Sequence, residues 1–198
     1  MNNRSGVHRK QTSRYIAAAT ALSLGLAVAP VAGLAAEQAV PAEKNPPGDI
    51  PDTQVFIDYA SPEGFTMKVP EGWARTDRAD GASFVDKLDG VVLTVAKADT
   101  APTVEIAKKT YVPELANAER AVRVSTVKAV KLPAGQAIRI VYTSNSEPNQ
   151  VTNKQVRLEN ERYIYFNAGK LVTLELYAPK GADNVDQWQL MSKSFQWK

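Results

Sequence analysis

The sequence contains no cysteine, and its only histidine, His8, lies close to the N-terminus. A Ser-His-Asp or Cys-His catalytic arrangement needs an imidazole that accepts a proton near neutral pH. Zinc, copper and haem sites depend mainly on imidazole or thiolate ligands. The shortage of both side chains makes these classes of enzyme and metalloprotein poor candidates, and we expect no cofactor and no bound metal.

Three kinds of chemistry need neither side chain: acid–base catalysis by carboxylates, Ser-Lys catalysis, and hard-cation sites built from oxygen ligands. The acidic residues are scattered, and the stretch Asp77–Asp80 lacks the dense Asp, Asn and Gly pattern of a calcium loop. No catalytic residue is therefore assigned. The lack of cysteine also excludes disulfides, so the core alone must stabilise the fold.

Residues 1–36 have the pattern of a secretory signal peptide. Four basic and no acidic residues precede an apolar stretch from Tyr15 to Ala36 that ends in small side chains. The small residues Ala35 and Ala36 predict cleavage just before Ala36 or Glu37. The alternative is an uncleaved membrane anchor, since about 20 apolar residues can cross a bilayer. Without cysteine, attachment through a lipid-modified N-terminal cysteine is excluded.

Removal of residues 1–36 would change the charge balance. It would take away His8, four of the 24 basic residues and none of the 21 acidic ones. The remaining near-neutral chain gives no electrostatic reason to expect a nucleic acid or an anionic membrane as partner. We expect an exported protein, secreted or in the cell envelope. Its expected partner is another envelope or secreted protein, or a small ligand, with membrane contact only if the signal is retained.

Residues 37–54 contain four prolines and few apolar side chains. Such a composition favours an extended, solvated chain over packed structure. It predicts a disordered tether, followed by a single domain over residues 55–198. A length of about 140 residues is usual for one domain with one core.

The motif Pro-Glu-Gly-aromatic occurs twice, at residues 62–65 and 70–73. Between the copies, apolar residues alternate with Thr66 and Lys68, which is the period of a strand with one buried face. Proline and glycine are turn residues, so the motifs are predicted to bracket this short strand. They are not interpreted as catalytic. Trp73 is predicted to be buried, so that its replacement by alanine would cost about 3 to 5 kcal/mol.

Three hairpins are predicted from apolar runs separated by turn residues. The runs are 82–88 and 91–98 around Asp89-Gly90, 122–132 and 136–146 around residues 133–135, and 154–166 and 170–178 around residues 167–169. A helix is predicted over residues 102–119, kinked or split by Pro113. A second helix is predicted near the C-terminus, with Asp183 as its cap and Val185, Trp188, Met191 and Phe195 on one face. The chain is therefore predicted to be α+β.

One predicted strand is apolar on both of its faces. Ile164 and Phe166 alternate with Tyr163 and Tyr165. A sheet with one face in water would not show this pattern. We therefore expect a mostly antiparallel sheet covered by helices on both faces, an α/β/α sandwich, with the tyrosines in its core.

The opening strand and the C-terminal region carry a resemblance to a known family. Its residues are Gly64, Phe65, Pro70 and Trp73 at the front, and Gly169, Leu174, Pro179, Trp188, Ser194, Phe195 and Trp197 at the back. This pattern resembles the PsbP-like superfamily, which includes extrinsic photosystem proteins, a eukaryotic Ran-binding factor and exported bacterial proteins of the LpqN and DcrB kinds. The resemblance implies an α/β/α sandwich that acts as a non-catalytic binding or assembly module. LpqN-like proteins are commonly lipoproteins, whereas this chain lacks the lipid-bearing cysteine.

Three functions stay open from the sequence. The first is an exported, non-catalytic binding or adaptor module of the bacterial cell envelope. The alternatives are a hydrolase that uses carboxylates or a Ser-Lys pair, and a structural subunit tethered to the membrane by an uncleaved N-terminal segment. A buried pair of acidic side chains in a deep cleft would favour the hydrolase, and a shallow polar groove beside an irregular loop would favour the binding module.

The longest polar stretch inside the predicted domain is Thr143–Lys154. A simple hairpin needs only about two to five loop residues. Because rigid scaffolds commonly present their contacts on loops, we expect partner-binding residues here. The candidates are Asn145, Glu147, Asn149 and Asn153.

Overall fold

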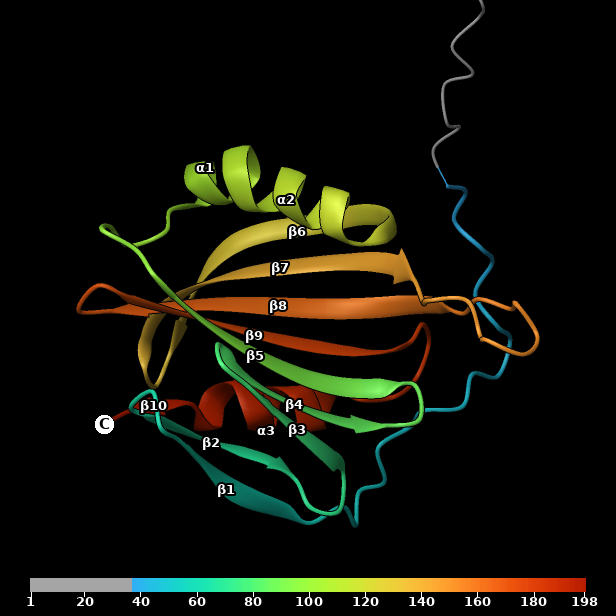
Figure 1. The fold of residues 1–198 in the computed structure, drawn as a ribbon, viewed down its shortest axis with the longest axis horizontal. Coiled ribbons are helices and arrows are strands. Elements are labelled where there is room, and N and C mark those ends of the chain that lie inside the picture. The colour runs from blue at the N-terminus through green and yellow to red at the C-terminus, as the bar shows by residue number, and fades with distance from the viewer. Residues whose placement is uncertain (1–36) are drawn as a thin grey trace, which may run out of the picture. The chain divides into compact units, whose positions relative to one another are not determined.

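The computed structural model describes residues 37–198, and the predicted signal peptide and its cleavage site at Ala35 and Ala36 lie outside the described residues. Figure 1 shows the elements of this part of the chain. The strands are β1 (Phe56–Ser61), β2 (Phe65–Pro70), β3 (Ala74–Arg78), β4 (Gly81–Asp86), β5 (Asp89–Lys97), β6 (Arg120–Leu132), β7 (Gly135–Asn145), β8 (Arg157–Asn167), β9 (Lys170–Pro179) and β10 (Gln196–Trp197). The helical segments are α1 (Val104–Ile106), the π-helical turn η1 (Ala107–Tyr111), α2 (Val112–Ala118) and α3 (Val185–Ser194).

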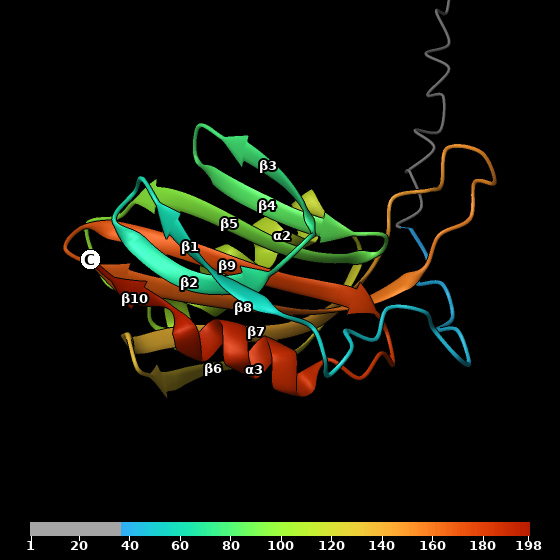
Figure 2. The ribbon, with the colours of Figure 1, turned by 90° about the horizontal axis from the view of Figure 1, so that it is seen from below.

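The strands form two antiparallel sheets. The large sheet has the order β3-β4-β5-β9-β8-β7-β6, and the small sheet has the order β1-β2-β10. Figure 2 shows the small sheet and α3 on one side of the large sheet. The predicted α+β class with antiparallel strands is confirmed. The expectation of one sheet flanked by helices alone has to be revised, because the small sheet shares this layer with α3.

The two Pro-Glu-Gly motifs bracket strand β2, as predicted. Gly64 and Gly72 have φ angles of +86° and +83°, a left-handed backbone that glycine adopts without strain. Phe65 is fully buried, but Trp73 is only partly buried at the edge of the core. The prediction of a buried Trp73 is therefore wrong, since its ring packs only partly against the main core.

The main core lies between the large sheet and the layer made by α3 and the small sheet. The ring of Phe195 stacks on Tyr165 with ring centroids 4.1 Å apart, and on Phe65 with centroids 5.1 Å apart. Trp188 and Met191 of α3 belong to the same cluster, together with Tyr163. The prediction that the tyrosines of β8 are core residues is confirmed.

A second core forms where the helical segment 104–118 packs on residues of the large sheet that do not belong to the main core. Ala107 and Leu115 are buried with Ile138 and Ile140 of β7 and Ile164 of β8. The Thr103 hydroxyl caps this segment by accepting a hydrogen bond from the Ile106 N–H. The predicted split at Pro113 is confirmed, because a π-helical turn precedes α2 and the proline occupies its first turn, where an N–H is not needed.

The three predicted hairpins are confirmed as pairings, with one turn displaced. The β4–β5 turn falls at Lys87-Leu88, where Lys87 has a φ of +53°, and Asp89 and Gly90 already belong to β5. Gly90 is required for a different reason. A Cβ atom at this position would lie 2.1 Å from Cζ of Tyr177, so the absence of a side chain lets the tyrosine ring pack on the strand.

Helix α3 begins one residue later than predicted. The residue before its first turn is Asn184, and its side chain does not cap the helix. Its amide instead binds the N-terminal segment, accepting from the Ile50 N–H at 2.6 Å and donating to the Gly48 carbonyl at 2.8 Å. Val185 is 61 % exposed, so its predicted place on the buried face is wrong, whereas Trp188 and Met191 lie there as predicted.

Residues 37–54, here called the strap, form no helix or strand but lie along the domain. Ile50 is buried, and the Gln187 amide donates to its carbonyl at 3.1 Å. This differs from the solvated tether predicted from the prolines. Prolines prevent regular structure, but buried amide side chains of the domain satisfy the backbone groups of the strap in place of a neighbouring strand. Among residues 37–198, no helix is long and apolar enough to cross a membrane.

Candidate functional site

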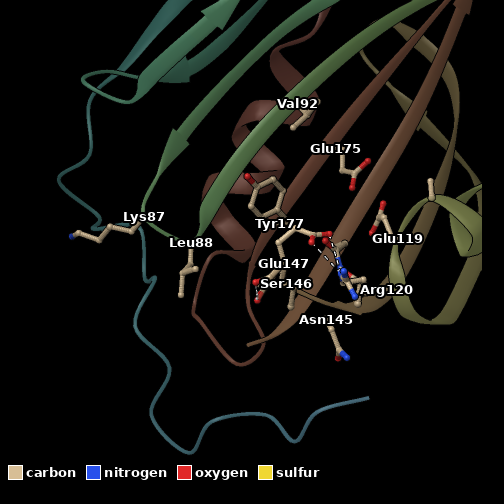
Figure 3. A pocket seen from close by; sticks show the side chains of 14 residues that line it. Lys87, Leu88, Val92, Glu119, Arg120, Asn145, Ser146, Glu147, Glu175 and Tyr177 are labelled. Carbon is tan, nitrogen blue, oxygen red and sulfur yellow. Dashed lines mark hydrogen bonds and ion pairs between the residues drawn. The ribbon is translucent and has the colours of Figure 1, made fainter. Parts of the chain in front are cut away.

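A groove of about 460 Å³ lies at one end of the large sheet (Figure 3). It is bounded by the C-terminal end of α2, the β4–β5 turn and the beginning of the β7–β8 loop. Its lining residues are Lys87, Leu88, Val92, Ala118, Glu119, Arg120, Ser144, Asn145, Ser146, Glu147, Leu158, Asn160, Glu175 and Tyr177. The groove forms because α2 ends at Ala118 and leaves the strands beyond it uncovered.

Two glutamates lie close together in the groove wall. Glu119 follows the last residue of α2, and Glu175 lies in β9. The Tyr142 hydroxyl lies within hydrogen-bond distance of both carboxyl groups, 2.8 Å from that of Glu119, and the Arg162 guanidinium donates to both. Figure 3 shows the two carboxyl groups facing one another. We call these four residues the glutamate pair and its partners.

The two contacts of the Tyr142 hydroxyl indicate that one of the two carboxyl groups carries a proton. A phenol has one hydroxyl proton and can donate to one oxygen at a time, so the second contact of Tyr142 needs a proton on a carboxyl group. Burial, followed by the charge of Glu175, raises the pKa of Glu119 from 4.5 to about 8. Burial is also the main cause that raises the pKa of Tyr142 above its usual range. Near neutral pH, Glu119 is therefore protonated.

The rim of the groove carries its own ion pairs. The Arg120 guanidinium donates from Nε to both carboxylate oxygens of Glu147, at 3.0 and 3.1 Å. Its Nη1 donates to Glu37 of the strap at 2.6 Å. The wall opposite α2 is formed by Leu88, Val92 and the ring of Tyr177. The groove thus combines an apolar wall with polar groups most of which already have partners.

The structure separates the four predicted loop residues. Glu147 lies on the rim, and Asn145 belongs to the end of β7, where it is 4 % exposed and contacts the strap. Asn149 orders the loop, because its side chain accepts from the backbone N–H groups of Val151 and Thr152. Asn153 has a φ of +56° and donates its N–H to the Asn149 carbonyl. Two of the four residues therefore line the groove, and two shape the turn.

The glutamate pair was not predicted from the sequence. One signal was present, since Glu175 is the single charged residue within the apolar stretch Leu171–Ala178. A buried charge in such a strand needs a partner. Glu119 showed no such signal, because it ends a polar helix face and becomes a neighbour of Glu175 only when β6, β7 and β8 pair in register.

We expect Glu119 to make the stability of the protein depend on pH. Its pKa is higher in the folded chain than in the unfolded chain, so its contribution is fully present below about pH 4.5 and is lost as the pH rises towards 8. Glu119→Gln keeps a neutral side chain that cannot ionise. Urea unfolding of this variant between about pH 5 and pH 8 should show a weaker loss of stability than the wild type.

Asp89→Asn provides the control for this prediction. Burial, followed by the charge of Asp86, raises the pKa of Asp89 to about 7. Asp89 does not line the groove, so its replacement should remove a separate part of the pH dependence. A Glu119→Gln variant with the same pH dependence as the wild type would show that Glu119 is ionised in the folded protein.

No protein-family model matches the sequence, and a comparison with curated proteins finds no match. Solved structures do show similarity. The cyanobacterial PsbP protein (CyanoP) of Synechocystis sp. PCC 6803 has a TM-score of 0.54 and 13% identity, over 76% of this chain and 98% of that one. The Ran-binding protein Mog1p of Saccharomyces cerevisiae has a TM-score of 0.51 and 10% identity, over 73% of this chain and 96% of that one. LpqN of Mycobacterium tuberculosis, involved in cell envelope biogenesis, has a TM-score of 0.46 and 13% identity, over 73% and 90% of the two chains.

The first two similarities define the fold. This chain has the fold of PsbP-like proteins, and the predicted resemblance is confirmed at that level. A fold hosts many functions, so the roles of residues cannot be transferred at 10% to 13% identity. The function has to be argued from the groove and the strap.

Proposed function

We propose that the protein is an exported, non-catalytic binding module of the bacterial cell envelope, and that the groove beside the β7–β8 loop contacts its partner protein. The fold supports this proposal, since Mog1p, which shares it, is a Ran-binding protein. The predicted signal peptide supports export. The predicted absence of histidine and cysteine from the mature chain supports a binding role, since it removes the commonest catalytic groups.

The observation that carries the proposal is that most of the groove's polar side chains already have hydrogen-bond partners. Glu119 and Glu175 are held by Tyr142 and Arg162. The Ser144 hydroxyl accepts from the Asn160 amide, and the Ser146 hydroxyl accepts from the Val156 N–H. A nucleophile needs a free base beside it, whereas a binding surface needs fixed donors, acceptors and apolar area.

One observation favours a hydrolase as the second candidate. A carboxyl group with a raised pKa beside a second carboxyl group resembles the arrangement of a general acid and a general base. However, both carboxyl groups contact the same phenol oxygen and the same guanidinium, which holds them together instead of on opposite sides of a scissile bond. Hydrolysis of aryl glycosides or esters that Glu175→Gln abolishes would favour the hydrolase.

The third candidate, a structural subunit tethered to the membrane, depends on residues 1–36. Mass measurement of the exported protein separates it from the first. A chain that starts near Ala36 or Glu37 would support a released module, and a chain that retains Tyr15–Ala36 in the membrane fraction would support the tethered subunit.

Site-specific photo-crosslinking tests the proposed function directly. A photoreactive phenylalanine analogue at Leu88 places the probe on the groove wall. The same analogue at Asp58 places it on the exposed edge strand β1 of the small sheet, as the control. Mass spectrometry of crosslinked envelope material should identify a protein captured from position 88 and not from position 58. Identical proteins from both positions, or none from position 88, would contradict the proposal.

The β7–β8 loop should be needed for the partner and not for folding. Ser146 and Val156 close the end of the hairpin through the Ser146 N–H and hydroxyl, so a shortened loop can start beyond them. Replacing residues 147–154 by a two-residue Asn-Gly turn should change the free energy of unfolding by less than about 1 kcal/mol, because loop closure depends weakly on length. The same variant should lose the protein crosslinked from position 88.

The matched control for the loop is Asn153→Gly, which keeps the loop length and suits the φ of +56° at this position. This variant should fold and should still capture the partner. If the shortened chain folds and captures the partner as well as the control does, the loop does not take part in binding.

A further inference from the structure

A carboxylate of the chain itself occupies a set of donors beside the groove. Oε1 of Glu37 accepts from the Asn145 side-chain amide at 2.9 Å and from the Gln155 side-chain amide at 2.6 Å. Its Oε2 accepts from Arg120 at 2.6 Å. The hydrogen bonds from Asn145, Gln155 and Arg120 lower the pKa of Glu37 to about 2. We call Arg120, Asn145 and Gln155 the carboxylate cradle.

Each donor of the cradle is held by a second contact that does not involve Glu37. Arg157, which is 4 % exposed, donates to Oδ1 of Asn145 at 2.9 Å and so fixes which way this amide points. Glu147 holds Arg120, and the Ser146 carbonyl accepts from Gln155 at 3.2 Å. The cradle is therefore pre-organised and would keep its shape if Glu37 left it.

The cradle also recognises peptide backbone. Oδ1 of Asn145 accepts from the Val40 N–H at 3.0 Å, and its Nδ2 donates to the Gln38 carbonyl at 2.8 Å. A single buried amide thus binds a carboxylate, a backbone N–H and a backbone carbonyl of one extended segment. This combination selects a peptide with an acidic side chain, and a free anion would satisfy only part of it.

Residues 37–40 of the strap can leave the cradle without disturbing the anchored residues 48–54. Residues 48–54 are anchored by the buried Ile50 and by the amides of Asn184 and Gln187. Within the part of the chain that the structure describes, no hydrogen bond involves residues 41–47. Glu37 to Val40 therefore form a separate polar attachment, joined to the firm anchor by a solvated, proline-containing stretch.

We propose that the cradle is a recognition site for an extended acidic peptide segment of the partner protein, and that Glu37 occupies this site in the free protein until the partner displaces it. This inference rests on the proposed function, because Arg120 and Asn145 also line the groove. The strap then acts as an internal competitor, and the partner carries a carboxylate where the strap carries Glu37.

The test uses the full exported chain with Glu37→Gln, which removes the competing charge. The probe is an N-acetylated peptide with the sequence of residues 37–44, and the readout is the NMR shift of the Asn145 and Gln155 side-chain amides. The variant should bind the peptide at least about tenfold more tightly than the wild type, because Glu37 competes within the chain at a roughly millimolar effective concentration. A peptide with glutamine at its first position should bind about tenfold more weakly than the acidic peptide, because it lacks the charge-assisted hydrogen bonds.

Two further variants complete the test. Glu43→Gln changes an exposed residue of the strap outside the cradle and should behave as the wild type. Arg120→Gln combined with Glu37→Gln should abolish peptide binding, and Arg120 is exposed enough that the fold should survive.

Three results would overturn the inference. The first is no binding to the Glu37→Gln variant, and the second is equal binding of the acidic and neutral peptides. The third is a dimer of the wild-type protein that Glu37→Gln abolishes, because the occupant would then be a second copy of this chain. If these results appear while the probe at position 88 still captures a partner, the proposed function stands and the acidic-peptide inference fails.

Discussion

Replacement of Phe195 by alanine is expected to lower the free energy of unfolding by about 3 to 5 kcal/mol. Phe195 has no exposed surface, and its ring lies between Tyr165 of the large sheet and Phe65 of the small sheet. It also contacts Trp197 in an edge-to-face arrangement with centroids 5.0 Å apart. Loss of this ring would leave a cavity where three elements meet, and urea unfolding measures the cost.

Trp73→Ala is the matched control, because it removes an aromatic ring that is only partly buried against the same core. Its cost should be clearly smaller than that of Phe195→Ala. Equal losses for the two variants would show that the second Pro-Glu-Gly turn packs more tightly than its partial burial indicates, as the sequence alone had predicted.

Replacement of Arg162 by methionine is expected to cost about 3 to 5 kcal/mol near pH 8. Methionine keeps much of the volume but removes the cation that contacts both Glu119 and Glu175. The side chains of these residues are only 16 % to 23 % exposed, so water would replace the lost partner only in part. Urea unfolding at several pH values measures this effect.

The cost should shrink as the pH falls. The charge of Arg162 lowers the pKa of Glu119, so without it Glu119 holds its proton more tightly in the folded chain, and protonation removes unpaired charge. Lys68→Met is the control, since its pair with Asp58 is exposed and should be worth less than about 1 kcal/mol. A cost for Arg162→Met that does not change between about pH 5 and pH 8 would mean that the glutamates do not carry the unpaired charge.

The local elements of this protein follow from its sequence for clear physical reasons. Strand β2 is bracketed by turn residues on both sides, and the helical segment 104–118 is divided before Pro113. The alternation of Tyr163, Ile164 and Tyr165 places apolar residues on both faces of β8, and both faces are indeed buried. The fold class could be predicted because turns, proline positions and hydrophobic periods act over a few neighbouring residues.

Such local rules could not predict the interactions between distant segments. The composition of the strap predicts an extended chain, but its contacts with Asn145 and Asn184 join residues more than 100 positions apart. Asn145 was chosen from the sequence as a residue for a partner, and the structure places the chain's own Glu37 against it. Asn145 can bind both Glu37 and a partner protein only if the partner displaces the strap.

What the sequence determined by itself is the α+β class, the hairpins and the shortage of histidine and cysteine that argues against most catalytic chemistry. Only the tertiary structure decided where the groove lies and which charges meet in it. Glu119 follows α2, whereas Tyr142, Arg162 and Glu175 lie in β7, β8 and β9, and each looks like an ordinary surface or strand residue in its own segment. Strand register brings them together, because a shift of one residue in β7, β8 or β9 would turn that strand's member of the cluster to the opposite face of the sheet.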